Sequence, residues 1–170
     1  MLLDSFLLGM LGLAVIYDVD SRRIPNWLVF SGIAFALLYH LYLGGCPGLL
    51  FSIKGLLLGI MLLMLPFIMG GMGAGDVKLL GMVGAFKGSI FTFSSFLGMA
   101  LWGGIIAIVL LLVKRRLKET LWRLGLGLFM VRLAGASMSD YVQKGATSVY
   151  YPYGIAIGLG VLTSYGRGWW

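Results

Sequence analysis

Long apolar runs separated by short polar stretches make up most of the chain. A membrane-spanning helix needs about 20 mostly apolar residues. Runs close to this length predict five spans, over residues 1–17, 25–43, 49–69, 90–113 and 150–165. The shorter apolar run "VKLLGMVGAF" at residues 77–86 predicts one more segment, which ends at "KGS". We therefore expect an all-α membrane protein, a polytopic bundle of about six transmembrane helices.

The stretches between these runs carry residues that favour turns. In the first loop, "DVDSRRIPN" at residues 18–26, Pro25 suits the first turn of the next helix because its missing N–H costs nothing there. "GGCPG" at residues 44–48 predicts the second turn. A run of glycines then leads to Asp76, which we expect at the start of the fourth segment.

The most polar stretch, residues 114–147, has helical periodicity over part of its length. Leucines recur on one face and basic residues surround them: Leu117, Leu121, Leu124 and Leu128 against Arg115, Arg116, Lys118 and Arg123. Such a pattern is typical of a short amphipathic helix in the headgroup plane of an anionic leaflet. The alternative is a solvated connector with a few anchoring leucines.

Composition supports the membrane interpretation. Of the 170 residues, 60% are hydrophobic and 11% are charged, whereas soluble domains have about 45–50% and about 25%. We expect a single transmembrane domain over residues 1–170, whose first span is retained because no basic region precedes it. The 27 glycines predict close helix packing. Cys46 is the only cysteine, which excludes a disulfide within the chain and a CxxC metal site.

Charge predicts the orientation in the membrane. The formal net charge is +7, and cytoplasmic loops carry an excess of Lys and Arg. The first loop and residues 114–147 hold most of these residues, so we expect both to be cytoplasmic and both termini to be outside. Lys87 and Arg167 then fall outside and count against the model. No stretch interleaves aromatic and basic residues as a nucleic-acid groove does, so we expect a lipid bilayer and no nucleic acid as partner.

Two carboxylates lie at the predicted cytoplasmic ends of spans: Asp18 ends the first, and Asp76 opens the fourth. A charge inside a bilayer costs at least about 2.5–3.5 kcal/mol on insertion scales, so both are functional candidates. Two close carboxylates in a low dielectric share one proton. The ionised one can take a proton from water while the other polarises a peptide carbonyl, as peptide hydrolysis requires. The alternative is a plain turn in which Asp76 caps the fourth helix.

Three motifs resemble one known family. "GAGD" at residues 73–76 matches the GxGD motif of intramembrane aspartyl proteases, and the longer "GMGAGDVKLLGMVGAF" resembles the type IV prepilin peptidases and archaeal preflagellin peptidases. "YDVDSRRIPN" at residues 17–26 and "YPYGIAIGLG" at residues 151–160 resemble the family's other two segments, in the same order. GxGD alone is a weak signal, whereas the ordered set is strong.

The resemblance implies that Asp18 and Asp76 are the catalytic pair. Asp20 competes with Asp18 for the first role. Asp18 matches the family's position at the end of the first helix, and because residues two apart on a helix point to nearly opposite faces, both are not expected to face the same partner. Gly73, Gly75 and Lys78 match the rest of the motif and would bind substrate or support the site. For Lys78 the alternative is an interfacial lysine that reaches out to water.

The resemblance also implies the substrate, a prepilin-like protein with a short basic leader that is cut at the cytoplasmic face of the plasma membrane, without cofactor or metal. Many bacterial members carry an insert with two CxxC pairs that is linked to N-methylation. This chain has one cysteine, so it resembles the short, peptidase-only form that serves Flp-type pili or archaeal filaments. The oligomeric state is not predicted.

Two other functions fit a small membrane protein with aspartates. A proton-coupled transporter would need carboxylates nearer the middle of the bilayer and often has repeated halves, which this chain does not show. A non-catalytic assembly subunit of a pilus or secretion machine would need no paired aspartates.

Overall fold

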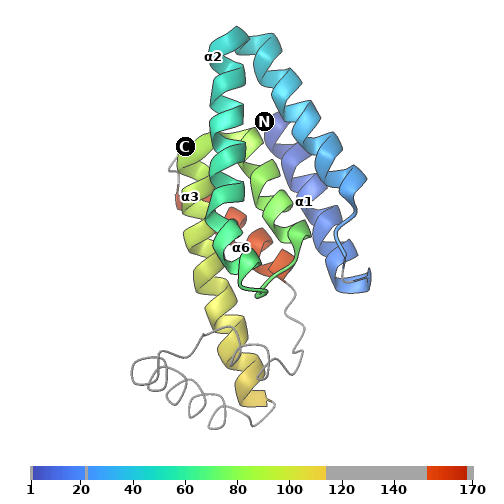
Figure 1. Ribbon diagram of the computed structural model, residues 1–170, viewed down its shortest axis with the longest axis vertical. Coiled ribbons are helices and arrows are strands. Elements are labelled where there is room, and N and C mark those ends of the chain that lie inside the picture. The colour runs from blue at the N-terminus through green and yellow to red at the C-terminus, as the bar shows by residue number, and fades with distance from the viewer. Residues whose placement is uncertain (1, 22, 114–152, 168–170) are drawn as a thin grey trace. The chain divides into compact units, whose positions relative to one another are not determined.

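The computed structural model describes residues 2–21, 23–113 and 153–167, and within them every regular element is an α-helix. There are four: α1 (Leu2–Ser21), α2 (Asn26–Ile68), α3 (Ala74–Val113) and α6 (Tyr153–Arg167) (Figure 1). Of the described residues, those up to 103 and 153–167 belong to one compact unit, and residues 104–113 fall outside it. The amphipathic helix expected at about 114–147 lies outside the described residues.

The described residues therefore hold four helices, where about six were expected. Two expected turns are each reduced to a single non-helical glycine, Gly45 in α2 (φ 57°, ψ −146°) and Gly88 in α3 (φ 76°, ψ −176°). Glycine reaches a positive φ without steric cost, so the helix resumes directly after the break. We call the parts the first and second arms of α2 (residues 26–44 and 46–68) and of α3 (residues 74–87 and 89–113).

The chain turns back on itself at Gly45, as Figure 1 shows for α2. A Cβ on Gly48 would overlap the carbonyl oxygen of His40, so the two arms approach closely just after the turn. Residues 41–47 at this turn are exposed.

The first arm of α3 is the centre of the bundle. Seven of its residues are buried hydrophobics, which are Val77, Leu79, Leu80, Met82, Val83, Ala85 and Phe86. The Phe86 ring lies 6.1 Å from that of Phe6 in α1 and 6.2 Å from that of Phe35 in α2. The short run that looked like the least regular span in the sequence is thus enclosed by other helices.

Glycines allow the second arm of α2 to reach this central helix. A Cβ on Gly55 would overlap the carbonyl oxygen of Gly84, and one on Gly59 would lie 2.6 Å from that of Leu80. These pairs show that the two arms run antiparallel with their backbones in contact. Buried Ser52 adds a hydrogen bond, donated by its Oγ to the Ala85 carbonyl at 2.7 Å.

Helix α6 packs antiparallel against the second arm of α3. Ser164 near its end donates a hydrogen bond to Ser94 Oγ at 3.0 Å and accepts one from Ser95 at 3.3 Å. Nearer its start, Gly160 leaves no room for a Cβ beside the backbone of Met99. Small and hydroxyl residues at such a contact are typical of helices that associate in membranes.

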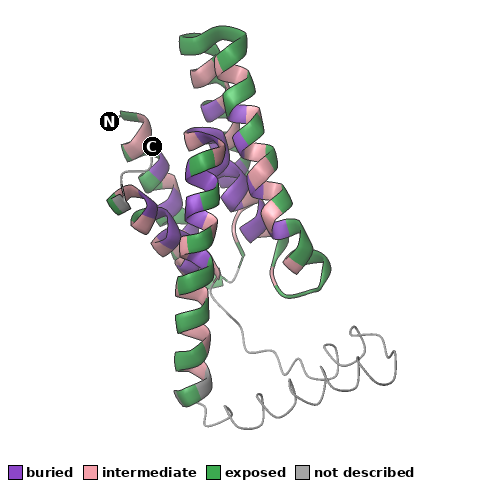
Figure 2. Cartoon of the chain, turned by 90° about the vertical axis from the view of Figure 1, so that its left-hand side faces the viewer, coloured by how far each residue is buried: buried purple, intermediate pink, exposed green. Residues whose placement is uncertain are grey.

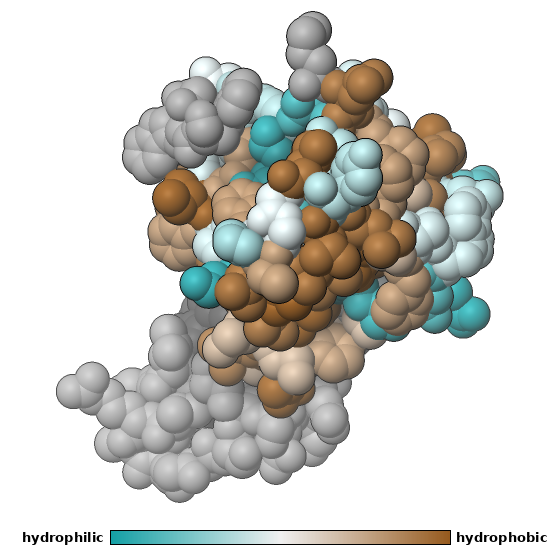
Figure 3. Space-filling model, turned by 90° about the horizontal axis from the view of Figure 1, so that it is seen from above, coloured by the Kyte–Doolittle hydropathy of each residue, from teal (hydrophilic) through white to brown (hydrophobic). Residues whose placement is uncertain are grey.

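The outer surface is apolar. Helices α1, α2 and α3 are each long and apolar enough to cross a membrane, and α6 is a shorter apolar helix. Figure 2 shows buried residues where the helices meet and exposed ones elsewhere, and many exposed side chains are large hydrophobics. Apolar side chains also cover much of the face in Figure 3. These features are those of a protein surrounded by lipid.

The close contact of Gly55 and Gly84 can be tested by Gly84→Ala. The new Cβ would collide with the Gly55 carbonyl, so we expect the free energy of unfolding to fall by about 1–3 kcal/mol, as in other overpacked sites. The measurement is the melting temperature in detergent. Gly12→Ala is the matched control, because no atom lies within 4 Å of a Cβ there. Equal melting temperatures for the two variants would contradict this contact.

Candidate active site

Asp18 lies on the buried face of α1. Its side chain is 5% exposed and continues the stripe of Leu7, Leu11 and Ala14, which recurs at the spacing of one helix face. Asp20, two residues on, is exposed. The helical period therefore turns one of the two aspartates inward and the other outward.

Asp76 lies in the first turn of α3 and is 7% exposed. Its Oδ2 accepts a hydrogen bond from the Gly73 N–H at 3.2 Å. A carboxylate at the third helical position that reaches back to the residue before the helix is half of a capping box. Asp76 therefore stabilises the start of α3, as the plain-cap interpretation holds, and it does so while buried in the bundle.

The start of α6 binds the carboxylate of Asp18. The Gly154 N–H at the start of α6 donates a hydrogen bond to Asp18 Oδ2 at 2.9 Å. The first N–H groups of a helix have no partner within the helix, and its N-terminus favours negative charge. A Cβ on Gly154 would lie 2.7 Å from Asp18 Oδ2, so only glycine lets the backbone come this close.

The fold brings Asp18 and Asp76 together. They are far apart in sequence, yet close enough for the negative charge of Asp18 to act on Asp76. The contacts of their neighbours show how: Tyr17 in α1 and Lys78 in α3 both meet the start of α2, at Trp27 and Asn26 respectively. The two carboxylates thus lie at the same end of the bundle.

The loop before α2 also packs against the glycine motif. A Cβ on Gly75 would lie 3.2 Å from Cβ of Ile24. Lys78 Nζ donates a hydrogen bond to Asn26 Oδ1 at 3.0 Å and lies 5.2 Å from the centre of the Phe30 ring. Two motifs that the sequence keeps apart are therefore in direct contact, and the partner of Lys78 is the start of α2 rather than either carboxylate.

Sequence reasoning did not find Gly154. The segment "YPYG" contributed to the resemblance, but nothing in it indicated a contact with Asp18. A glycine in the first turn of a helix is the signal that was present. Among the described residues, no three His, Cys, Asp or Glu side chains gather as metal ligands would.

One comparison with known proteins gave a match. The model of the type IV leader peptidase family matches residues 5–112. This stretch contains both aspartates and the glycine motif but ends before α6. No curated protein and no solved structure matches the chain.

The contact between α6 and Asp18 predicts that Gly154→Ala impairs a peptidase that uses this carboxylate. The added Cβ would displace Asp18 Oδ2, and a shift of about 1 Å can cost about a hundredfold in rate. We expect such a loss in cleavage per folded molecule. Gly158→Ala is the control, because its Cβ would make an ordinary contact of 3.4 Å with Val15. Cleavage by Gly154→Ala at the rate of Gly158→Ala would contradict the prediction.

Proposed function

The chain belongs to the type IV leader peptidase family, and we propose that it is a membrane-embedded aspartyl endopeptidase. Its substrates would be type IV prepilin-like proteins of the Flp-type pilin or preflagellin kind, from which it removes the short basic leader. One observation carries the aspartyl mechanism: Asp18 and Asp76, from different helices, are both buried at the same end of the bundle.

The proposed chemistry needs only these two carboxyls and a water molecule. Their mutual repulsion in an apolar bundle favours the state in which they share one proton. The ionised carboxylate takes a proton from water as the oxygen attacks the peptide carbonyl, and the protonated one donates to the carbonyl oxygen. Proton return to the amide nitrogen then breaks the C–N bond, and no covalent intermediate forms.

Backbone groups would hold both carboxyls in position. Gly154 N–H binds one oxygen of Asp18, and Gly73 N–H binds one oxygen of Asp76. Each side chain is thereby fixed by a group that cannot rotate away, which is the preorganisation that a catalytic pair requires.

The glycine run would bind the substrate. Gly73 is exposed and Gly75 is half-buried against Ile24, so their backbone lies at the surface next to Asp76. An extended segment around the cut could pair with this backbone by main-chain hydrogen bonds. We propose Gly73 and Gly75 as substrate-binding residues on this basis.

We further propose that the cut takes place at the cytoplasmic side of the plasma membrane. The aspartates lie at the end of the bundle where the first loop, with exposed Arg23, joins α1 to α2, and basic loops face the cytoplasm. That loop has no room for an insert with two CxxC pairs, so we propose cleavage without N-methylation.

Asp18→Asn and Asp76→Asn test the proposed chemistry. Each variant keeps the shape of the side chain but cannot exchange the proton, so we expect cleavage of a co-expressed prepilin to fall by at least about a thousandfold, the upper range for loss of acid–base catalysis. The protein should still accumulate in the membrane. Asp20→Asn is the control and should cleave normally.

Cleavage at the wild-type rate by both variants would overturn the proposal. Loss of proton flux through liposomes in Asp76→Asn, with cleavage intact, would instead favour a transporter. Normal filaments with leaders removed in the Asp18→Asn/Asp76→Asn double variant would favour an assembly subunit.

Lys78→Gln tests whether Lys78 supports the site or joins the chemistry. Its Nζ contacts Asn26 and Phe30, so the variant loosens the start of α2 without removing a proton donor at the carboxyls. We expect cleavage to fall by no more than about a hundredfold, because a hydrogen bond to a charged group contributes about 1.5–3 kcal/mol. A loss as large as that of the Asp variants would place Lys78 in the catalytic machinery.

A further inference from the structure

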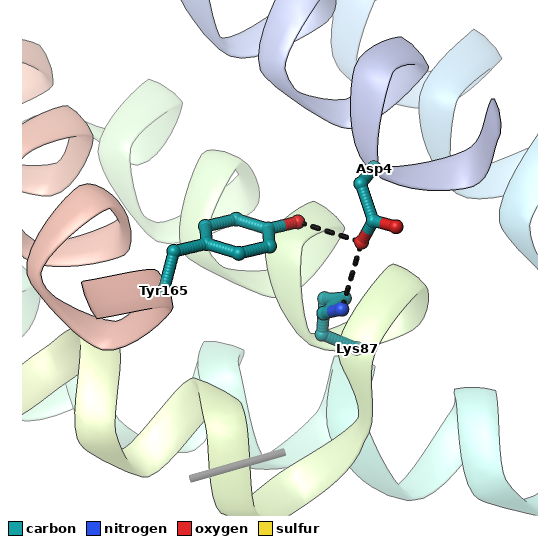
Figure 4. Close-up of polar contacts among 3 residues, drawn as sticks. All are labelled: Asp4, Lys87 and Tyr165. Atoms are coloured by element: carbon teal, nitrogen blue, oxygen red, sulfur yellow. Dashed lines mark hydrogen bonds and ion pairs between the residues drawn. The ribbon is translucent and has the colours of Figure 1, made fainter. Parts of the chain in front are cut away.

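Three polar side chains meet far from the aspartate pair. Asp4 Oδ1 accepts hydrogen bonds from Lys87 Nζ at 2.8 Å and from Tyr165 Oη at 2.9 Å (Figure 4). Lys87 Nζ also lies 5.0 Å from the centre of the Tyr165 ring and 5.3 Å from that of Phe91. The side chain of Lys87 is 11% exposed and that of Asp4 is 28% exposed, so the bundle encloses the lysine more than the carboxylate.

Each of the three residues shares a helix with one group of the candidate active site. Asp4 precedes Asp18 on α1 by about four turns. Lys87 follows Asp76 on the first arm of α3 by about three turns, immediately before the break at Gly88. Tyr165 follows Gly154 on α6, also by about three turns. One cluster therefore joins the far ends of the three helices whose near ends build the site.

We propose that Asp4, Lys87 and Tyr165 form a distal clamp that fixes the axial positions of α1, α6 and the first arm of α3 and thereby positions Asp18, Gly154 and Asp76. The three are positioning residues and touch no substrate. The effect on cleavage rests on the proposed function, whereas the effect on helix position does not.

The physical argument is that the ion pair tolerates little displacement. Separating Lys87 from Asp4 leaves the mostly buried lysine charge without its partner. A slide of α1 by one residue, about 1.5 Å, would stretch both hydrogen bonds to Asp4 beyond useful length. Because a helix is stiff along its axis, the same slide would move Asp18 away from Gly154 N–H. The axial position of α1 that allows the hydrogen bonds to Asp4 is thus the same one that allows the hydrogen bond between Asp18 and Gly154.

A disulfide probe can report helix position without catalysis. Val15 and Gly158 face each other one turn from the contact of Asp18 with Gly154, and a Cβ on Gly158 would lie 3.4 Å from Val15 Cγ2. In a Cys46→Ser background, Val15→Cys with Gly158→Cys should cross-link α1 to α6 under mild oxidation. The cross-linking yield is compared between the cysteine pair alone and the cysteine pair combined with Lys87→Met or with Tyr165→Phe. Prepilin cleavage is measured separately, in Lys87→Met and Tyr165→Phe chains that lack the two added cysteines.

We expect both clamp variants to lower the cross-linking yield and to lower kcat per folded molecule by about tenfold to a hundredfold, with little change in KM. Lys87→Arg, which keeps the cation, should restore both. Lys54→Met and Tyr42→Phe are matched controls, because Lys54 and Tyr42 are exposed on α2, and they should change neither readout.

Unchanged cross-linking and kcat in Tyr165→Phe and Lys87→Met would overturn the clamp. Reduced cross-linking with unchanged kcat would overturn its positioning role. If Lys87→Met does not accumulate, Tyr165→Phe decides, because it removes one oxygen and leaves the ion pair. If the wild-type chain cuts no prepilin while the clamp variants still alter cross-linking, the proposed function fails and the clamp holds.

Discussion

A charged or polar group inside an apolar helical bundle has to find a partner there, and this requirement shapes the structure. Asp18 binds the start of α6, and Asp76 binds the residue just before its own helix. Asp4 accepts hydrogen bonds from both Lys87 and Tyr165. The contacts of Asp18 and Asp4 each fix one helix against another, and that of Asp76 fixes the start of its own helix. Helices with apolar outer faces, which lipid would let slide past one another, are held by a small number of specific polar contacts.

Glycine makes these contacts reachable. The first arm of α3 is short, and it can lie at the centre only because the second arm of α2 approaches it backbone to backbone at Gly55 and Gly84. Gly88 then lets the chain leave the centre with a positive φ. The same residue type brings the start of α6 against Asp18. Close packing and the site therefore depend on one local property, the absence of a side chain.

Much of this could be read from the sequence, and the remainder could not for physical reasons. Helical period predicts that Asp18 and Asp20 face opposite sides, and the resemblance selects Asp18, which is the buried one. The end of the fourth apolar run coincides with the break at Gly88. The described residues hold four helices where about six segments were expected, because apolar runs do not reveal that a helix can resume directly after a single glycine such as Gly45 or Gly88. Lys87 counted against the predicted membrane orientation because it falls on the outer side. The sequence could not show that Lys87 forms an ion pair with Asp4. The contact of Gly154 with Asp18 depends on packing between distant helices, which no local pattern encodes.

The hydrogen bond between Asp18 and the start of α6 has a consequence for biosynthesis. The chain is made from its N-terminus, so both aspartates enter the membrane while α6 (Tyr153–Arg167) is still to come. Until that helix inserts, the Asp18 carboxylate lacks the N–H that orients it. The surroundings of Asp18 are thus complete only after α6 has been made and has packed against α1.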